Sequence, residues 1–335
     1  MTTHPSQMRR HLTLAVSVAL ALLAGGCADT ESDGDAASES PATVSAAPAE
    51  GSAEDTSAAE EAAPTNPAGG GVNQALTRDD VDCTSEGLGG DDDATFTSAY
   101  YVVDGDLGAV CFGEGDSTVE KAWRILADFT PPGQLNDLAL FAGFDSGEQG
   151  DEVSLAFVNS VDDDSLFQMS VNVAEADADA EELTLTLAHE FSHVFTAIPS
   201  ELDRDADPDS CATYWSGEGC YVEGGLMANW IDAFWRPDLI EQLDPEAEAT
   251  AAEGQERCDL DPQFFGAYGA SNPEEDFAES FSAFVLRVPS ESDAQQAKLD
   301  WIAARPGLAE FRDRAESAGY GPQEHNFDPC GQADG

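Results

Sequence analysis

The chain has 335 residues, of which 67 are acidic and only 13 are basic, so its formal net charge is −54 at pH 7. So acidic a chain is repelled by the phosphates of nucleic acids and by anionic lipid headgroups. The composition therefore argues against nucleic acid as a partner. It also predicts that any link to a membrane runs through a lipid anchor and not through a charged surface.

Residues 1–26 have the pattern of a signal peptide, in which two adjacent arginines precede an apolar run from Leu12 to Ala24. The run is short for a membrane span. It ends at Cys27 in a stretch that resembles a bacterial lipoprotein signal, where the cysteine becomes the lipidated first residue. Free secretion is the alternative, because Ala24 stands where such signals prefer leucine. Both routes predict an extracytoplasmic protein.

Residues 27–72 form the second predicted segment. After Cys27 they are almost entirely Ala, Ser, Glu, Asp, Pro, Thr and Gly, without one aromatic residue, Leu or Ile. Such a composition cannot bury enough apolar surface to offset the entropy of the chain. We therefore predict a disordered tether that carries no chemistry.

The cysteines after Cys27 are even in number, which predicts disulfide bonds in an exported chain. They are Cys83, Cys111, Cys211, Cys220, Cys258 and Cys330. The short separation makes Cys211–Cys220 the simplest pair to propose, and Cys83–Cys111 and Cys258–Cys330 would follow. Because no C-x-x-C spacing occurs, a metal site built from thiolates is the less favoured interpretation.

Residues 73–335 have the composition of one globular domain with a sizeable core. The first half predicts a mixture of strands and helices, and the second half is helical in pattern, so we expect an α+β fold. Ser117 is the predicted cap of the first helix, and a second helix is expected from about Glu181. The predicted strands are 99–103, 138–144, 153–159 and 166–173.

The second helix contains the pattern H-E-x-x-H within apolar residues. His189 and His193 are four positions apart, so on a helix they lie on one face and can bind one metal ion together. The neighbouring Glu190 can reach a water at that metal and act as a general base. Only five histidines occur in the chain, so two of them in this pattern favour a metal site over two ordinary core histidines.

A catalytic zinc ion needs a third protein ligand, which leaves the fourth position for water. Asn272 before Pro273 predicts the start of a helix, on which Glu275 and Glu279 lie one turn apart on the same face. We predict that Glu275 is the third ligand, and the alternative is that it only closes a capping box. Glu279 is expected to accept the N–H of a ligating histidine. His325 lies in a loop-like segment and is expected at the surface.

The two motifs together resemble the gluzincin family of zinc metallopeptidases. More narrowly, the segment from Tyr268 through Asn272 to the run Glu-Asp-Phe-Ala-Glu-Ser-Phe at 275–281 is similar to the third-ligand segment of the anthrax lethal factor catalytic domain. It is also similar to a segment of uncharacterised bacterial lipoproteins of the zinc metallopeptidase type. The resemblance covers the two motifs and not the whole chain. It implies a zincin-like fold, with a small mixed sheet and the H-E-x-x-H helix in an upper lobe and a mainly helical lower lobe.

This resemblance also implies residue roles. Glu275 would bind zinc, Glu279 would support the site, and Tyr268 would stabilise the tetrahedral intermediate. We therefore expect a monomeric metalloendopeptidase with one catalytic zinc ion, Glu190 as general base and a peptide or protein substrate. The alternatives are a lipoprotein that binds metal without catalysis and a cell-surface interaction protein on an inactive zincin scaffold.

Overall fold

The computed structural model has a mixed α+β fold, which confirms the α+β part of the prediction. The described residues are 71–90, 94–147, 154–161, 165–244, 249–324, 327 and 330. The predicted signal peptide, Cys27, nearly all of the tether and His325 lie outside this set. Within it, no helix is both long and apolar enough to cross a membrane.

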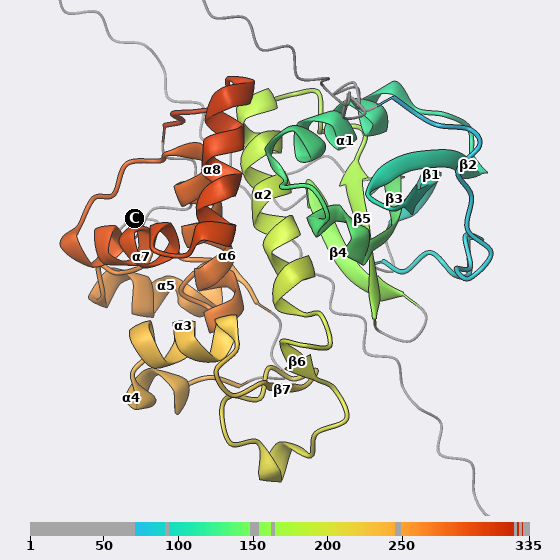
Figure 1. Cartoon of the computed structure of the whole chain (residues 1–335). Coiled ribbons are helices and arrows are strands. Elements are labelled where there is room, and N and C mark those ends of the chain that lie inside the picture. Colours follow the sequence, from blue (N-terminus) through green and yellow to red (C-terminus); the bar gives the residue numbers. More distant parts are fainter. Residues whose placement is uncertain are drawn as a thin grey trace, which may run out of the picture. The chain divides into compact units, whose positions relative to one another are not determined.

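The first half of the described chain forms a five-stranded mixed sheet (Figure 1). The order is β2-β1-β3-β5-β4, in which β3 and β5 are parallel and the other neighbours are antiparallel. Asp104 and Gly105 join β1 to β2, both with the positive φ of a tight hairpin turn. The strands are β1 (Thr95–Val103), β2 (Asp106–Gly113), β3 (Leu138–Asp145), β4 (Ala156–Val161) and β5 (Leu166–Asn172). The predicted strands are thus all present, and β2 was not predicted.

One face of the sheet packs against α1 (Ser117–Phe129) and α2 (Ala180–Thr196). Side chains from the strands and the helices meet there, as in the edge-to-face contact of Trp123 with Phe141, whose ring centroids lie 5.3 Å apart. Asp116 caps α1 by accepting the N–H groups of Thr118 and Val119, so the prediction of Ser117 as the cap was wrong by one residue. The larger side chain of Asp116 reaches the free N–H groups of the first turn.

Helix α2 lies between the sheet and the helices α6 (Pro273–Leu286) and α8 (Pro306–Ala318) (Figure 1). Asp179 caps α2 through the N–H groups of Glu181 and Glu182, so the helix begins where it was predicted. Aromatic contacts hold α2 to its neighbours, with the Phe195 ring 5.2 Å from Phe281 and 5.8 Å from Phe311. Because it is covered on both sides, α2 is buried along nearly its whole length.

The second half is mainly helical, as predicted, and its two short strands were not predicted. Its last two helices are separated just before Pro306, which begins the second of them. Asn272 caps α6 by accepting the N–H of Glu275 at 2.9 Å, and Pro273 occupies the first turn, which confirms the predicted start. The remaining elements are β6 (Leu202–Asp203), β7 (Cys220–Tyr221), α3 (Leu226–Phe234), α4 (Pro237–Ile240), α5 (Ala251–Leu260) and α7 (Asp293–Ala303), with short 3₁₀ helices at Gln134–Asp137 and Pro208–Ser210.

Three disulfide bonds confirm the predicted pairing of the cysteines. Cys83–Cys111 joins the segment before β1 to β2, Cys211–Cys220 closes a short loop between β6 and β7, and Cys258–Cys330 ties α5 to the C-terminal segment. Disulfides persist in oxidising compartments. The pairing is therefore compatible with the predicted location outside the cytoplasm.

Helix α5 lies very close to the loop 266–272, which leads into α6. Arg257 donates from Nε to the carbonyl oxygen of Ala270 at 2.6 Å and from Nη2 to that of Ser271 at 2.8 Å. A Cβ atom at Gly254 would overlap the carbonyl oxygen of Ala267. Only glycine allows this approach, so α5 acts as a brace for the loop that carries Tyr268.

Replacing Gly254 with alanine should therefore destabilise the protein. An alanine inside a helix normally favours it by about 1 kcal/mol relative to glycine. Here, overpacking should instead lower the free energy of unfolding by about 1–3 kcal/mol, measured by denaturant titration of the oxidised protein. Gly307→Ala in α8 is the matched control, because a Cβ there meets nothing within 4 Å. Equal stability of the two variants would contradict the close approach of α5.

Candidate metal centre

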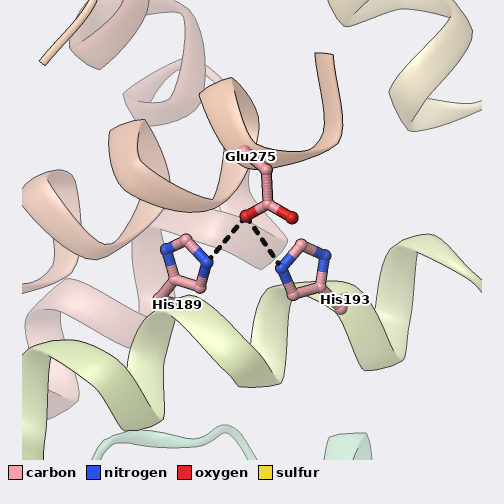
Figure 2. A group of neighbouring side chains, drawn as sticks. All are labelled: His189, His193 and Glu275. Carbon is pink, nitrogen blue, oxygen red and sulfur yellow. Dashed lines mark hydrogen bonds and ion pairs between the residues drawn. The ribbon is translucent and has the colours of Figure 1, made fainter. Parts of the chain in front are cut away.

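Helices α2 and α6 bring the three predicted metal ligands together (Figure 2). His189 and His193 lie one turn apart on α2 and point toward the first turn of α6, where Glu275 faces them. The Oε2 atom of Glu275 is 3.0 Å from His189 Nε2 and 3.5 Å from His193 Nε2. The capping-box alternative does not account for this geometry, because the Glu275 carboxylate faces the histidines while Asn272 caps the Glu275 N–H.

The arrangement fits a small divalent metal ion. The three ligand atoms all lie within 4.8 Å of one another. Two ligand atoms bound at about 2.0–2.1 Å to a tetrahedral zinc ion lie roughly 3.3 Å apart. The distances from Glu275 Oε2 to the two histidine Nε2 atoms, 3.0 Å and 3.5 Å, bracket this separation. Two histidines and a glutamate form a known donor set of catalytic zinc, although two histidines and a carboxylate also bind iron. The geometry therefore supports a metal site without identifying the metal.

The three side chains are strongly coupled, because Glu275 is only 1% exposed and both imidazoles lie against it. Burial raises the pKa of Glu275, but the charge of His193 and the hydrogen bond from His189 outweigh it and lower the pKa to about 2. Burial lowers the pKa of His193, yet the carboxylates of Glu275 and Glu190 raise it to about 9. For His189, burial outweighs the hydrogen bond and the charge of Glu275, so the pKa of His189 is lowered. A metal ion would therefore have to displace the proton of His193.

Neither carboxylate oxygen of Glu190 has a hydrogen-bond partner among the described residues. It is fully buried, next in sequence to His189. Burial raises the pKa of Glu190 well above its usual value; the charge of Glu275 acts in the same direction, and that of His193 opposes it. An unpaired buried carboxyl group is costly, so its presence beside the ligands calls for a chemical explanation.

Tyr268 also reaches the centre, from the loop that α5 braces. Its ring centroid lies 5.9 Å from that of His189, and the side chain is buried. Burial raises the pKa of the Tyr268 hydroxyl well above its ordinary value, and the nearby charges of Glu275 and Glu190 raise it further. The hydroxyl therefore keeps its proton and can act as a hydrogen-bond donor.

Glu279 is buried one turn beyond Glu275 on α6, on the face that the sequence predicted. Its Oε2 packs against Gly269, where a Cβ atom would overlap it, so glycine at this position makes room for the carboxylate beside Tyr268. Its charge also acts on the Tyr268 hydroxyl. Its role as acceptor for a ligating histidine stays a prediction.

Sequence reasoning missed Glu274 and Tyr221. Glu274 is not part of the ligand group, but its carboxylate is hydrogen-bonded to the hydroxyl of Tyr221 on β7. Its charge contributes to the raised pKa of His193. Burial is the main cause that raises the pKa of Glu274 to about 7. The contact between Glu274 and Tyr221 had almost no sequence signal beyond the two adjacent glutamates at a helix start. Tyr221 is distant in sequence and directly follows the loop closed by Cys211–Cys220.

No protein-family model, curated protein or solved structure matches this chain. The function is therefore inferred from the residues of the centre itself.

Removing the third ligand should abolish tight metal binding. We expect Glu275→Gln to weaken zinc affinity by more than about 100-fold, because an amide oxygen carries no charge and loss of a ligand exceeds the effect of losing a supporting contact. Competition with a chromogenic chelator measures this affinity. Glu274→Gln is the matched control, since it makes the same change at the adjacent position outside the ligand set, and it should cause a far smaller loss. Equal losses in the two variants would rule out a specific role for Glu275.

Proposed function

We propose that this chain is an extracytoplasmic zinc metalloendopeptidase of the gluzincin type. The observation that carries the proposal is the unpartnered, buried carboxyl group of Glu190 beside the group His189, His193 and Glu275. A protein that only bound or stored metal would need the three ligands but would have no use for Glu190. A peptidase needs a base at this position.

The proposed reaction is hydrolysis of a peptide bond by water. A zinc ion held by the three ligands would supply Lewis-acid activation of the water and polarisation of the scissile carbonyl group. Glu190 accepts a proton from the attacking water and delivers it to the amine that leaves, so the products are a carboxylate and a free amine. This proton transfer requires a carboxyl group that has no permanent hydrogen-bond partner, and Glu190 is such a group.

Tyr268 and Glu279 have supporting roles in the proposal. Tyr268, protonated because burial and neighbouring carboxylates raise its pKa, donates a hydrogen bond to the oxyanion that develops on the scissile carbonyl group. Glu279 orients a ligating histidine from its buried position on the same helix as Glu275. Loop 266–272 holds Tyr268 in place, so the brace formed by Arg257 is part of the catalytic scaffold.

The proposed location is outside the cytoplasm. The leader-like residues 1–26 and the three disulfide bonds support export. Cys27 would carry a lipid anchor, with free secretion as the alternative. The proposed partners are a peptide or protein substrate, and the proposed state is a monomer.

The proposal predicts that Glu190→Gln abolishes turnover and keeps metal. We expect cleavage to fall by at least about 100-fold, because general acid–base catalysis contributes about 10²–10⁴-fold. A diverse peptide library is incubated with the protein made under oxidising conditions, and new peptide termini are identified by mass spectrometry. Termini made by the wild type should disappear with a zinc chelator.

The matched control is Glu182→Gln, the same change in the first turn of α2 and away from the ligand set, which should cleave like the wild type. Wild-type cleavage by Glu190→Gln would contradict the role of the base. A wild-type protein that binds zinc and cleaves nothing in the library would favour the non-catalytic alternative.

A further inference from the structure

A second buried polar cluster begins at the residue that follows the proposed metal ligand Glu275. The next residue on α6, Asp276, is 1% exposed and forms an ion pair with Lys298 of α7, which is completely buried. The chain contains only two lysines, Lys121 and Lys298. One of them is thus placed where no solvent reaches it, in a chain whose surface is overwhelmingly acidic.

Both carboxylate oxygens of Asp276 have partners. Oδ1 binds Lys298 Nζ, while Oδ2 accepts the indole N–H of Trp230 at 3.2 Å and that of Trp235 at 2.9 Å. Lys298 Nζ also lies 4.6 Å from the centroid of the Phe264 ring, a cation–π contact. The cluster therefore connects the first turn of α6 with the tryptophans at the middle and end of α3 and with α7.

Global stability does not account for this cluster. The cost of removing two charges from water commonly equals or exceeds their attraction, and apolar residues of similar volume are often as stable or more stable. Directional bonds differ from apolar contacts in that they define one orientation. The Asp276 cluster fixes the first turn of α6 against translation and against rotation about the helix axis.

That restraint bears directly on Glu275. Successive residues leave a helix about 100° apart, so Asp276 can be anchored toward α3 and α7 while Glu275 faces α2. Because side-chain atoms lie about 5–6 Å from the axis, a rotation of 10° would move the Glu275 carboxylate by about 1 Å. Metal ligands must lie within about 0.5 Å of their required positions, so even this rotation would weaken metal binding.

We propose that Asp276, held by Lys298, Trp230 and Trp235, is a positioning residue that sets the carboxylate of Glu275 for metal binding. The inference rests on the metal-binding part of the proposed function and does not require that the site hydrolyse peptides. It explains why Lys298, the one buried lysine among the described residues, is paired with Asp276.

The test is a pair of conservative substitutions in one aromatic cluster. Trp235→Phe removes one N–H donor from Asp276 and retains an aromatic ring. Trp301→Phe is the control, because Trp301 packs 5.2 Å from Trp230 and its indole makes no bond to Asp276 among the described contacts. Zinc affinity is measured by chelator competition, the ligand field by the absorption spectrum of the cobalt-substituted protein, and folding by thermal melting.

Trp235→Phe should weaken zinc affinity by about 10-fold and alter the cobalt spectrum, as loss of a supporting contact does in other metal sites. Trp301→Phe should change neither. The double variant Asp276→Leu with Lys298→Met should fold with a melting temperature near that of the wild type and bind zinc at least about 10-fold more weakly. If the double variant does not fold, the zinc affinity and cobalt spectrum of Trp235→Phe alone decide whether Asp276 has the positioning role.

The measurements distinguish a failure of the proposed function from a failure of the positioning role of Asp276. A wild-type protein that binds no zinc overturns the proposed function and this inference together. A wild type that binds zinc, with unchanged affinity and cobalt spectrum in Trp235→Phe, overturns the positioning role alone. An equal loss in Trp301→Phe would also overturn it, because general repacking of the aromatic cluster would then suffice.

Discussion

The contact between α2 and α6 is the interaction on which the rest of the structure depends. It places the carboxylate of Glu275 against His189 and His193 in a region from which water is largely excluded. A buried negative charge needs compensation, and the imidazoles of His189 and His193 both lie against it. A divalent cation would satisfy all three side chains at once. The packing of Phe195 against Phe281 keeps the two helices in the register that this arrangement requires.

Helices α2 and α6 carry two buried carboxylates with opposite surroundings, Asp276 on α6 and Glu190 on α2. Asp276 is bonded at both oxygens and holds α6 in place, whereas Glu190 is buried without a partner for either oxygen among the described residues. A satisfied polar network specifies a structure, while an unsatisfied buried group is tolerated where it serves chemistry. This contrast, together with the ligand set, is the observation that favours the proposed role of Glu190 in proton transfer over a simple metal store.

The centre could be predicted from sequence because its signals are local. The spacing of His189 and His193 and the Asn272-Pro273 start of α6 each depend on a few neighbouring residues. Strand β2 was missed because glycines dilute its pattern, although the Asp-Gly turn before it was a usable signal. The pairing of Asp276 with Lys298 had no local signal, since it arises only when α3, α6 and α7 pack together. Membership of a zincin family and peptide hydrolysis stay hypotheses supported by these local motifs.

The most direct test of the account is a crystal structure of the zinc-loaded protein, with anomalous scattering recorded at the zinc absorption edge. The account predicts one anomalous peak between α2 and α6, at about 2.0–2.1 Å from the Nε2 atoms of His189 and His193 and within bonding distance of Glu275. Glu190 should lie beside the ion without binding it. A zinc ion bound elsewhere, or bound by Glu190 in place of Glu275, would contradict the account.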